Sequence, residues 1–267
     1  MNKIQEDLLW KNISELPYFR GFLRAVEGCF YREFAIKGPV LDLGCGDGHF
    51  SESTFKDIEL FGVDPSSNML QQAKGKEIFS NLIQSLGGNL PFPKNFFETV
   101  ISNSVLEHIP DVETVISEMV RVMKSGGIFI TTVPNNHFTD NLSVAKFFEN
   151  IGLRGGANFY RKLFNRISRH HHTDSPERWA ERLKENGLEI LRMWNYFPPV
   201  SLRILEFGHL LGLPTWINKQ LFGRWVLFSS KRNIYRRIIY SRILENYQKN
   251  QISENGAYTL IYARKIS

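Results

Sequence analysis

The chain has 267 residues and a mass of 31.0 kDa, which is enough for one large domain or two small ones. Apolar residues make up 42% of it and charged residues 22%, values that exclude a disordered polymer and a fibrous repeat. Only two cysteines are present, Cys29 and Cys45, so a disulfide-stapled mini-protein is excluded and we expect a reducing, cytoplasmic setting. The acidic residues near the start and the lack of an apolar run of about 18 residues predict neither a signal peptide nor a membrane span.

The net charge of +6 is concentrated in one segment. Residues 198–250 contain nine basic and two acidic residues, a net charge of +7, so the rest of the chain sums to −1. A nucleic-acid-binding surface, a membrane-surface helix and a lid over an anionic substrate would each carry such a charge. The charge therefore describes one segment and leaves these three interpretations open.

In chain order, the first predicted element is a helix over residues 17–35, whose apolar residues share one face. It precedes the first strand, and we expect it to cover the carboxyl edge of the sheet as a cap. From residue 38 to residue 134, short apolar runs alternate with amphipathic stretches. These runs predict strands over residues 40–43, 59–64, 81–84, 97–103 and 128–133.

Two helices are predicted between these strands. One opens at residues 65–67, where Ser66 or Ser67 is the N-cap, and the other begins near Asp111 and ends at the Ser-Gly-Gly run of residues 125–127. Strands that alternate with crossover helices are typical of a doubly wound α/β sheet with parallel strands.

The C-terminal half predicts a further helix and two closing strands. The helix runs from Pro176 to Gly187, and the strands cover residues 188–196 and 257–264. We therefore divide the chain into an N-terminal helical cap, a core interrupted once, and a basic helical insertion before the last strand. In residue numbers these are 1–37, 38–197 with 255–267, and 198–254.

Glycines and an acid follow the first two predicted strands. Gly44, Gly46 and Gly48 come directly after the first, where glycine lets the backbone turn sharply and approach a ligand. Asp64 ends the second, 18 residues past Gly46, where its carboxylate can accept hydrogen bonds from a ribose diol. Taken separately, the glycines could form a tight turn that binds no ligand, and Asp64 could be the N-cap of a helix. Together they predict a site for an adenosine-containing ligand.

Five sequence blocks resemble those of the class I S-adenosylmethionine-dependent methyltransferases. They are LDLGCGDG at 41–48, GVDPS at 62–66, LPF at 90–92 followed by FFETV at 96–100, SNSVLEHI at 102–109 and RVMKSGG at 121–127. The resemblance covers residues 38–134 and is closest to the small-molecule branch that includes ubiquinone-biosynthesis methyltransferases. It implies a Rossmann-like fold with a mostly parallel, seven-stranded sheet, S-adenosyl-L-methionine as cofactor, and methyl transfer as the activity.

The resemblance also assigns residues to the cofactor. It implies that Gly44 and Gly46 contact the methionine part, that Asp64 holds the ribose hydroxyls, and that Asn103 lies beside the methionyl group. The remaining expected cofactor residues belong to the first two blocks and are Asp42, Cys45 and Pro65.

One position departs from the family pattern. Where the family usually has an acidic residue that contacts the adenine amine, this chain has Leu86, which cannot make that contact. Adenine would then be held by a backbone group or by Asn89, unless the alignment shifts at this loop.

Methyl transfer asks for an aligned acceptor and the exclusion of water, and a hydroxyl acceptor also needs a base. His108 follows the strand at 97–103 and is the first candidate for this base, with Glu107 as its neighbour. His137 follows the strand at 128–133 and is the second candidate. The alternative interpretation is that His108 only caps the helix that begins near Asp111.

Three consecutive histidines occupy positions 170–172. Consecutive side chains point in different directions, and no second ligand group is obvious, so we predict no metal site. A position on the substrate side or in a loop is favoured over metal ligation.

The insertion at 198–254 is both basic and amphipathic. Residues 234–244 repeat apolar side chains at three- and four-residue intervals with arginines on another face, and an apolar, aromatic-rich stretch precedes them. A helical lid packed on the domain is favoured over a patch that contacts an anionic membrane. The two are compatible if the lid also admits a lipid-like acceptor.

Two other classes of protein compete with this interpretation. A nicotinamide-dependent oxidoreductase would have glycine or alanine where this chain has His49, and it would lack the last two blocks. A nucleic-acid-binding protein could use the basic segment, but its aromatic residues lie on apolar faces. We therefore expect a methyltransferase that acts on oxygen, nitrogen or carbon of a small, lipophilic acceptor, with no nucleic-acid partner; a non-catalytic cofactor-binding subunit is a further alternative.

Overall fold

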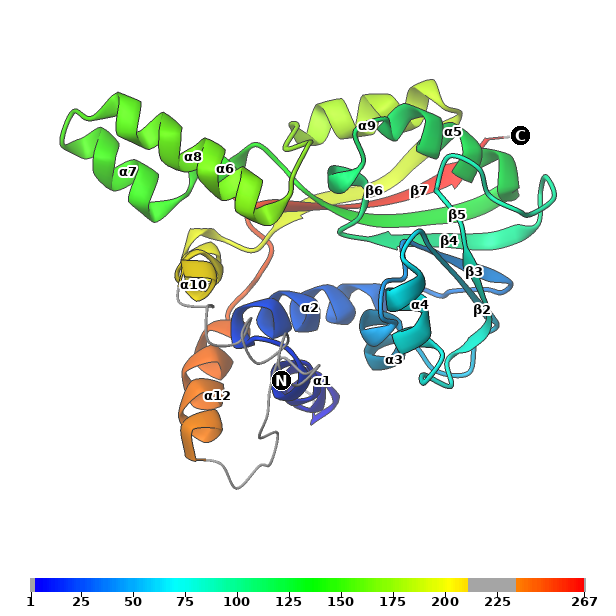
Figure 1. Ribbon diagram of the computed structural model, residues 1–267, viewed down its shortest axis with the longest axis horizontal. Coiled ribbons are helices and arrows are strands. Elements are labelled where there is room, and N and C mark those ends of the chain that lie inside the picture. The colour runs from blue at the N-terminus through cyan, green and yellow to red at the C-terminus, as the bar shows by residue number, and fades with distance from the viewer. Residues whose placement is uncertain (1–2, 211–233, 267) are drawn as a thin grey trace.

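The computed structural model describes residues 3–210 and 234–266 (Figure 1). The elements of the N-terminal half are α1 (Lys3–Glu15), α2 (Tyr18–Tyr31), β1 (Val40–Leu43), α3 (His49–Thr54), β2 (Leu60–Asp64), α4 (Ser67–Ala73), β3 (Phe79–Gln84), β4 (Phe97–Asn103), η1 (Leu106–His108), α5 (Val112–Val122) and β5 (Met123–Pro134). The elements that follow are α6 (His137–Asp140), α7 (Ser143–Asn150), α8 (Arg154–Ser168), α9 (Pro176–Glu185), β6 (Leu188–Tyr196), α10 (Pro199–Leu210), α12 (Ile234–Tyr247) and β7 (Tyr258–Lys265).

A single sheet of seven strands organises the fold. Its strand order is β3-β2-β1-β4-β5-β7-β6. The first five strands pair in parallel, and β7 lies antiparallel between β5 and β6. The predicted doubly wound, mostly parallel, seven-stranded sheet is therefore confirmed. The carboxyl ends of β1, β2 and β4 meet at one edge, where a ligand of such a sheet is bound.

Helices cover both faces of the sheet, with α5 and α9 on one face and α2, α3 and α4 on the other (Figure 1). The apolar face of α5 and Trp179 of α9 pack with β1, β4 and β5 in one buried cluster. Tyr31, at the end of α2, packs with Val40 and Ile101 on the opposite face. Both clusters bury apolar strand residues between layers, which is the main stabilising contribution in such a fold.

The N-terminal cap contains two helices where the sequence predicted one. Pro17 precedes α2 and separates it from α1, because proline favours a helix start and its neighbour leaves the helical conformation. The two helices pack against each other, and His49 at the start of α3 holds α1 in place. Its Nε2 lies 3.1 Å from Asn12 Oδ1 and its Nδ1 lies 3.1 Å from Glu15 Oε2.

The boundary between α5 and β5 differs from the prediction. The helix ends at Val122, and the glycines at 126 and 127 belong to β5 instead of ending the helix. The register between β4 and β5 shifts between Phe97 and Thr99, where Gly126 has a φ of 75°. A Cβ on Gly127 would lie 2.8 Å from the Lys124 carbonyl oxygen, so these glycines allow a bulge rather than a helix stop.

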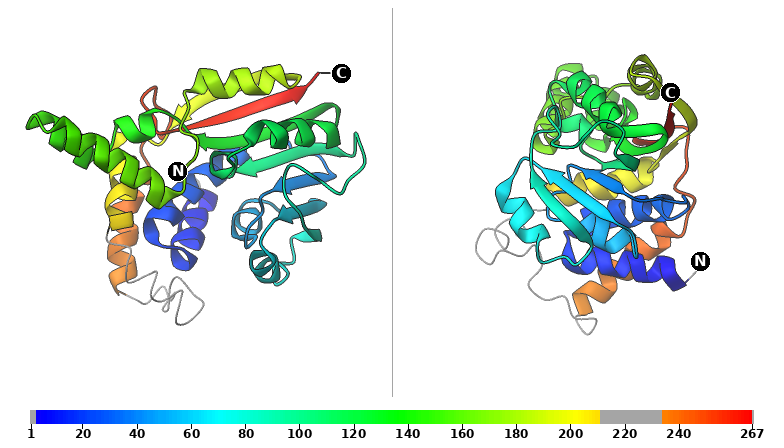
Figure 2. Two further views of the ribbon diagram at one scale, coloured as in Figure 1. Left: turned by 45° about the horizontal axis from the view of Figure 1, so that its top comes forward. Right: turned by 90° about the vertical axis from the view of Figure 1, so that its right-hand side faces the viewer.

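The sequence predicted no structure for residues 135–175, and three helices occur there. The short α6 is followed by α7 and α8, which form a helical hairpin that projects from the body of the molecule (Figure 1; Figure 2, left). Glu206 of α10 is fully buried and fixes the base of this hairpin. Its carboxylate accepts hydrogen bonds from the first two backbone N–H groups of α7, those of Ser143 at 2.7 Å and Val144 at 3.0 Å.

The described parts of the insertion pack on the N-terminal helices. Here α10 contacts α2, and α12 contacts both α1 and α2. Their buried side chains include Leu202, Leu205, Ile243 and Tyr247. The predicted helix at 234–244 is confirmed as part of α12, whereas most of the aromatic-rich stretch before it lies outside the described residues.

Candidate functional site

The turn after β1 contains two glycines, Gly44 and Gly46, that are needed for different structural reasons. The backbone N–H groups of Gly44 and Cys45 both donate to the Val63 carbonyl of β2, at 2.8 and 3.0 Å. Gly44 has a φ of 79°, and a Cβ there would lie 2.5 Å from a Val105 methyl group. Gly46 has a φ of 56°, but a Cβ there would meet nothing within 4 Å. Close packing thus requires Gly44, and Gly46 presents bare backbone to open space.

Asp64 joins the end of β2 to this turn. Its Oδ2 accepts the backbone N–H of Gly46 at 3.0 Å, and its Oδ1 accepts that of Ser66 at 2.8 Å. The side chain is half-buried, and a carboxylate has about four lone-pair sites, so it keeps acceptor capacity for a ligand. The N-cap of α4 is Ser66, whose hydroxyl accepts from the Met69 N–H, so Asp64 does not have the capping role that would have explained it without a ligand.

Three other predicted cofactor residues are placed around the turn. Asp42 is buried and accepts the Ser51 hydroxyl, so its carboxylate holds α3, and burial raises its pKa to about 7. The Cys45 thiol is buried, and burial raises its pKa. Pro65 is exposed beside Asp64. The side chains of Asp42 and Cys45 thus support the turn from inside.

Asn103, at the end of β4, is part of a charged cluster that the sequence did not reveal. Its Nδ2 donates to Thr132 Oγ1 at 2.7 Å, and its Oδ1 accepts a hydrogen bond from Arg24 of α2. Arg24 also donates to Glu27 Oε2 at 2.6 Å and to the Ser104 hydroxyl at 2.9 Å.

Glu27 itself is fully buried and also accepts the Tyr196 hydroxyl at 2.8 Å. Burial acts to lower the pKa of Arg24, but the charge and hydrogen bond of Glu27 outweigh it, so that pKa is raised. A glutamate and an arginine three residues apart on an otherwise apolar face were the available signal.

Leu86 lies in the connection between β3 and β4, residues 85–96, which contains no helix. Its side chain is 70% exposed. The Leu86 carbonyl accepts the Asn89 backbone N–H at 3.1 Å, and the Asn89 carbonyl accepts the Ser85 hydroxyl at 2.5 Å. The loop therefore holds an apolar side chain out at the sheet edge where an acid was expected.

His108 lies in η1 beside Glu107 and His170. Its Nδ1 is 2.9 Å from the Arg169 carbonyl oxygen, its Nε2 is 3.7 Å from Glu107 Oε1, and its ring centroid is 5.5 Å from that of His170. The N-cap of α5 is Asp111, which accepts the Thr114 N–H, so the interpretation of His108 as that cap is wrong.

Two polar atoms of this cluster are buried without a hydrogen-bond partner among the described residues, Glu107 Oε2 and His170 Nδ1. Burial raises the pKa of Glu107 to about 8 and lowers that of His170 to about 3. At neutral pH the cluster thus offers a protonated carboxyl group and neutral imidazoles. Buried polar atoms without a partner are uncommon in folded proteins, and a water molecule, an ion or a bound ligand can satisfy them.

The histidines at 170–172 take different positions. The backbone N–H groups of His171 and His172 donate to the Glu107 carbonyl, at 2.8 and 3.1 Å, which fixes this loop against η1. The His172 ring contacts the Ile109 carbonyl at 3.0 Å, and the His171 side chain is exposed. Only His170 packs against His108, and Phe138 supports it at a centroid distance of 4.7 Å.

Glu107, His108 and His170 each offer one atom that could bind a metal, and these atoms lie within 4.8 Å of one another. Burial lowers the pKa of His108, and the charges of nearby arginines lower it further. The same positive potential opposes a divalent cation, so the cluster suits a neutral base better than a metal. The arginines are Arg24, Arg20 and Arg169.

His137 stands apart from this cluster. It begins α6, where its backbone N–H donates to Asn135 Oδ1 at 2.9 Å. The structure therefore brings His108, and not His137, together with other titratable groups near the end of β4.

Comparison with known proteins finds relatives of the part of the chain that contains this site. Residues 41–131 match the methyltransferase domain family. A demethylmenaquinone methyltransferase of Geobacillus sp. (strain WCH70) is 35% identical over 128 residues, which cover 44% of this chain and 55% of that protein. One from Lactococcus lactis is 41% identical over 97 residues, covering 33% and 38%. The chain thus spans about half the length, or less, of these relatives.

Solved structures share the fold at low sequence identity. An S-adenosylmethionine-dependent methyltransferase from Thermotoga maritima has a TM-score of 0.58 and 16% identity, with 92% of this chain and 91% of that chain covered. The geranyl diphosphate C-methyltransferase of Streptomyces coelicolor, solved with Mg²⁺, geranyl diphosphate and S-adenosyl-L-homocysteine, has a TM-score of 0.55 and 15% identity, covering 93% and 82%. These likenesses establish the fold.

Proposed function

Since the chain belongs to the class I S-adenosylmethionine-dependent methyltransferases, we propose that it transfers a methyl group from S-adenosyl-L-methionine to a small, lipophilic acceptor. The observation that carries this proposal is the hydrogen bond between the Gly46 backbone and the Asp64 carboxylate, with open space in front of Gly46. This is a glycine turn and an acid at the carboxyl edge of a parallel sheet, the place where adenosine-containing ligands bind.

The residues at this edge fit the cofactor. Asp64 has acceptor capacity for the ribose hydroxyls, and the bare backbone of Gly46 allows close approach of the methionine part. Leu86 offers an exposed apolar side chain for the face of the adenine ring, in place of the acid that would bind its amine. When bound, the cofactor supplies a methyl group on a positively charged sulfur, already activated for transfer.

The protein's own part is to orient the acceptor and, where the acceptor loses a proton, to take it. We propose that His108 is this base, because its lowered pKa leaves Nε2 neutral at pH 7 while the Arg169 carbonyl fixes the ring through Nδ1. Glu107, protonated at that pH, can donate its orphaned hydroxyl to the acceptor.

The acceptor class is supported by similarity. Relatives are named for demethylmenaquinone, and one structural neighbour for geranyl diphosphate. We also propose the division into a cap (1–37), a core (38–197 with 255–267) and an insertion (198–254), and contact with an anionic membrane at the periphery. Among residues 3–210 and 234–266, no helix combines the length and the apolar character that crossing a bilayer requires.

The direct test is transfer of a labelled methyl group. The purified protein is incubated with methyl-labelled S-adenosylmethionine and separate lipid-soluble and water-soluble extracts of cells. We expect label in a lipid-soluble product that depends on the protein, and a loss of most of it with Asp64→Ala. Label confined to water-soluble products would contradict the acceptor class, and no protein-dependent label in either extract would contradict the activity.

The role of His108 predicts a pH dependence. The neutral imidazole is the active form, so the rate should fall as the pH drops through the pKa of His108, which burial lowers from its ordinary value. With His108→Gln we expect a rate at pH 7.5 about 100-fold lower, without this acidic limb. Initial rates between pH 5 and 8 measure both, and His171→Gln, a change on the exposed neighbour, is the control. A limb that persists in His108→Gln would assign it to another group.

A further inference from the structure

The α7–α8 hairpin has an apolar surface that no described residue covers. It projects from the body of the molecule (Figure 1; Figure 2, left), and its inner face is already buried through Ala145, Ala157, Tyr160 and Phe164. Large apolar side chains nevertheless also occupy its outer surface, with 38–69% of each exposed. They are Phe147, Ile151, Leu153, Phe159, Leu163 and Ile167.

These side chains form a group, whereas single exposed apolar residues are ordinary on any protein. Phe159, Leu163 and Ile167 are spaced four residues apart and therefore share one face of α8. Phe147, Ile151, Leu153 and Phe159 all lie within about two helical turns of Gly152, where the hairpin reverses. The far end of the hairpin is therefore its most apolar part.

The hairpin is also strongly basic. Residues 141–169 contain six basic residues and one acid, Glu149, a net charge of +5. Arg161 pairs with that acid at 2.8 Å, which leaves an excess of positive charge on the hairpin. Lys162 and Arg166 alternate with the exposed Leu163 and Ile167 along α8, and Arg154 lies beside Leu153 at the reversal of the hairpin. Exposed apolar side chains with basic side chains beside them are typical of a helix that lies at a membrane interface with anionic headgroups.

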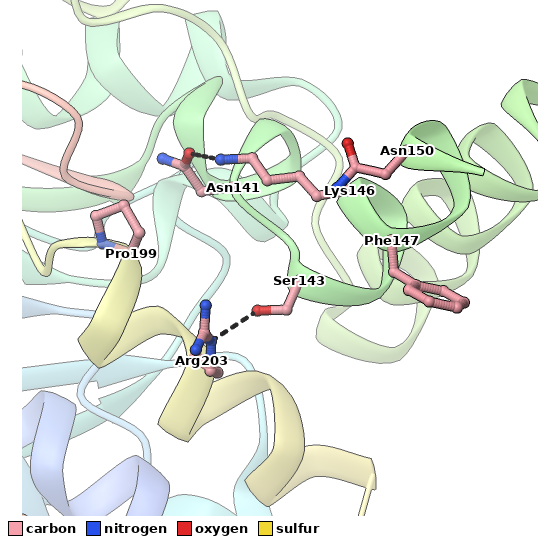
Figure 3. A pocket seen from close by; sticks show the side chains of 7 residues that line it. All are labelled: Asn141, Ser143, Lys146, Phe147, Asn150, Pro199 and Arg203. Carbon is pink, nitrogen blue, oxygen red and sulfur yellow. Dashed lines mark hydrogen bonds between the residues drawn. The ribbon is translucent and has the colours of Figure 1, made fainter. Parts of the chain in front are cut away.

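A pocket of about 310 Å³ lies at the base of the hairpin, between α7 and α10 (Figure 3). Two cations line it, and each contacts a neutral group: Lys146 Nζ donates to Asn141 Oδ1 at 2.7 Å, and Arg203 Nε donates to the Ser143 hydroxyl at 3.2 Å. An ammonium has three donors and a guanidinium five, so both retain donors for a phosphate group. Phe147 borders the same pocket and is 59% exposed, which joins the pocket to the apolar surface.

We propose that the α7–α8 hairpin is a membrane-docking element that inserts its apolar end into an anionic phospholipid surface, with a lipid phosphate bound between Lys146 and Arg203. A second copy of the chain is disfavoured as the occupant, because two surfaces of net charge +5 would repel each other. The described parts of the insertion, by contrast, bury Leu202, Leu205 and Ile243 on the N-terminal helices.

The base of the hairpin, at the opposite end from its apolar tip, adjoins the candidate site. Helix α8 ends at Ser168, two residues before His170, and Phe138 contacts both Phe164 of α8 and the His170 ring. The docking proposal itself does not depend on methyl transfer, since vesicle binding is measured without any reaction.

The test is flotation of the full chain with vesicles of phosphatidylcholine alone and of phosphatidylcholine mixed with an equal amount of phosphatidylglycerol. We expect binding to the anionic vesicles that weakens as salt is added, and a loss of about tenfold or more in binding with Phe147→Ser/Phe159→Ser. Lys146→Gln/Arg203→Gln should reduce the preference for anionic over neutral vesicles. All four positions are at the surface or in an open pocket, so the fold should persist, which thermal unfolding checks.

Matched controls lie on other faces of the molecule. Ile266→Ser removes an apolar side chain that is 56% exposed after β7, and Lys56→Gln/Lys74→Gln removes two exposed cations near α3 and α4. Both should bind like the unmodified chain. Equal binding by Phe147→Ser/Phe159→Ser would overturn the proposal. The proposal would also be overturned if the unmodified chain formed a concentration-dependent dimer that Phe147→Ser/Phe159→Ser abolished, because the hairpin would then be an interface between copies of the chain.

Discussion

Asp64→Ala is expected to weaken S-adenosylmethionine binding about 10- to 100-fold. The change removes a carboxylate that orients the glycine turn through Gly46 and that would hold the ribose hydroxyls. Hydrogen bonds to a charged group contribute about 1.5–3 kcal/mol each, and every 1.4 kcal/mol is a factor of ten in affinity. Isothermal titration calorimetry measures this loss of affinity directly. The affinity of Asp64→Asn should lie between those of the unmodified chain and Asp64→Ala.

The control for this prediction is Glu77→Ala, which removes an exposed acid from the loop before β3. It should leave the dissociation constant unchanged, because its side chain is not at the carboxyl edge. If Asp64→Ala bound the cofactor as tightly as Glu77→Ala does, the assignment of the ribose to Asp64 would be wrong. Thermal unfolding of both variants separates a loss of binding from a loss of folded protein.

Arg24→Met is expected to destabilise the folded chain by about 3 kcal/mol, the lower part of the range for breaking a buried ion pair, because Arg24 is itself 20% exposed. Its partner Glu27 is fully buried and would lose the cation that it contacts. At about 2–4 °C per kcal/mol, the melting temperature should fall by about 10 °C. Differential scanning calorimetry measures the shift.

Two further variants decide whether this loss comes from the isolated charge. Arg24→Met/Glu27→Gln removes both charges while keeping a hydrogen-bond acceptor for Tyr196, and it should recover much of the stability. Arg178→Met breaks an exposed pair with Glu181 and should have no measurable effect. If Arg24→Met melted with the unmodified chain, or if the double variant were no more stable than the single one, the cluster would not stabilise the cap in this way.

The local pattern of apolar and polar residues was sufficient to predict the parallel strands of the sheet. Its strands are short apolar runs that end at glycines or polar residues, and the two closing strands are marked in the same way, so their order in the sequence predicted the layers. The glycine turn and Asp64 could also be predicted, because both follow strands whose carboxyl ends meet at one edge. The contact between Gly46 and Asp64 joins two strands that are consecutive in the chain, so the local sequence was enough to predict that these residues lie close together.

The remainder of the site depends on contacts between distant segments. Arg24 and Asn103 are 79 residues apart, and no local pattern indicates that α2 reaches the end of β4. The hairpin was missed although α8 is amphipathic. Its apolar residues between Ala157 and Ile167 form one broad stripe, and its basic residues lie on the other side of the helix. His108 was a candidate from its position alone, but its pairing with His170 arises from a loop 62 residues further along the chain.

The most direct measurement is a crystal structure with S-adenosyl-L-homocysteine at saturating concentration. The account predicts that the ligand crosses the backbone of Gly46, with its ribose hydroxyls within hydrogen-bonding distance of Asp64 and its sulfur on the side of Asn103. Density for the ligand elsewhere, or an empty edge in a protein that binds a nicotinamide dinucleotide at the same turn, would contradict it.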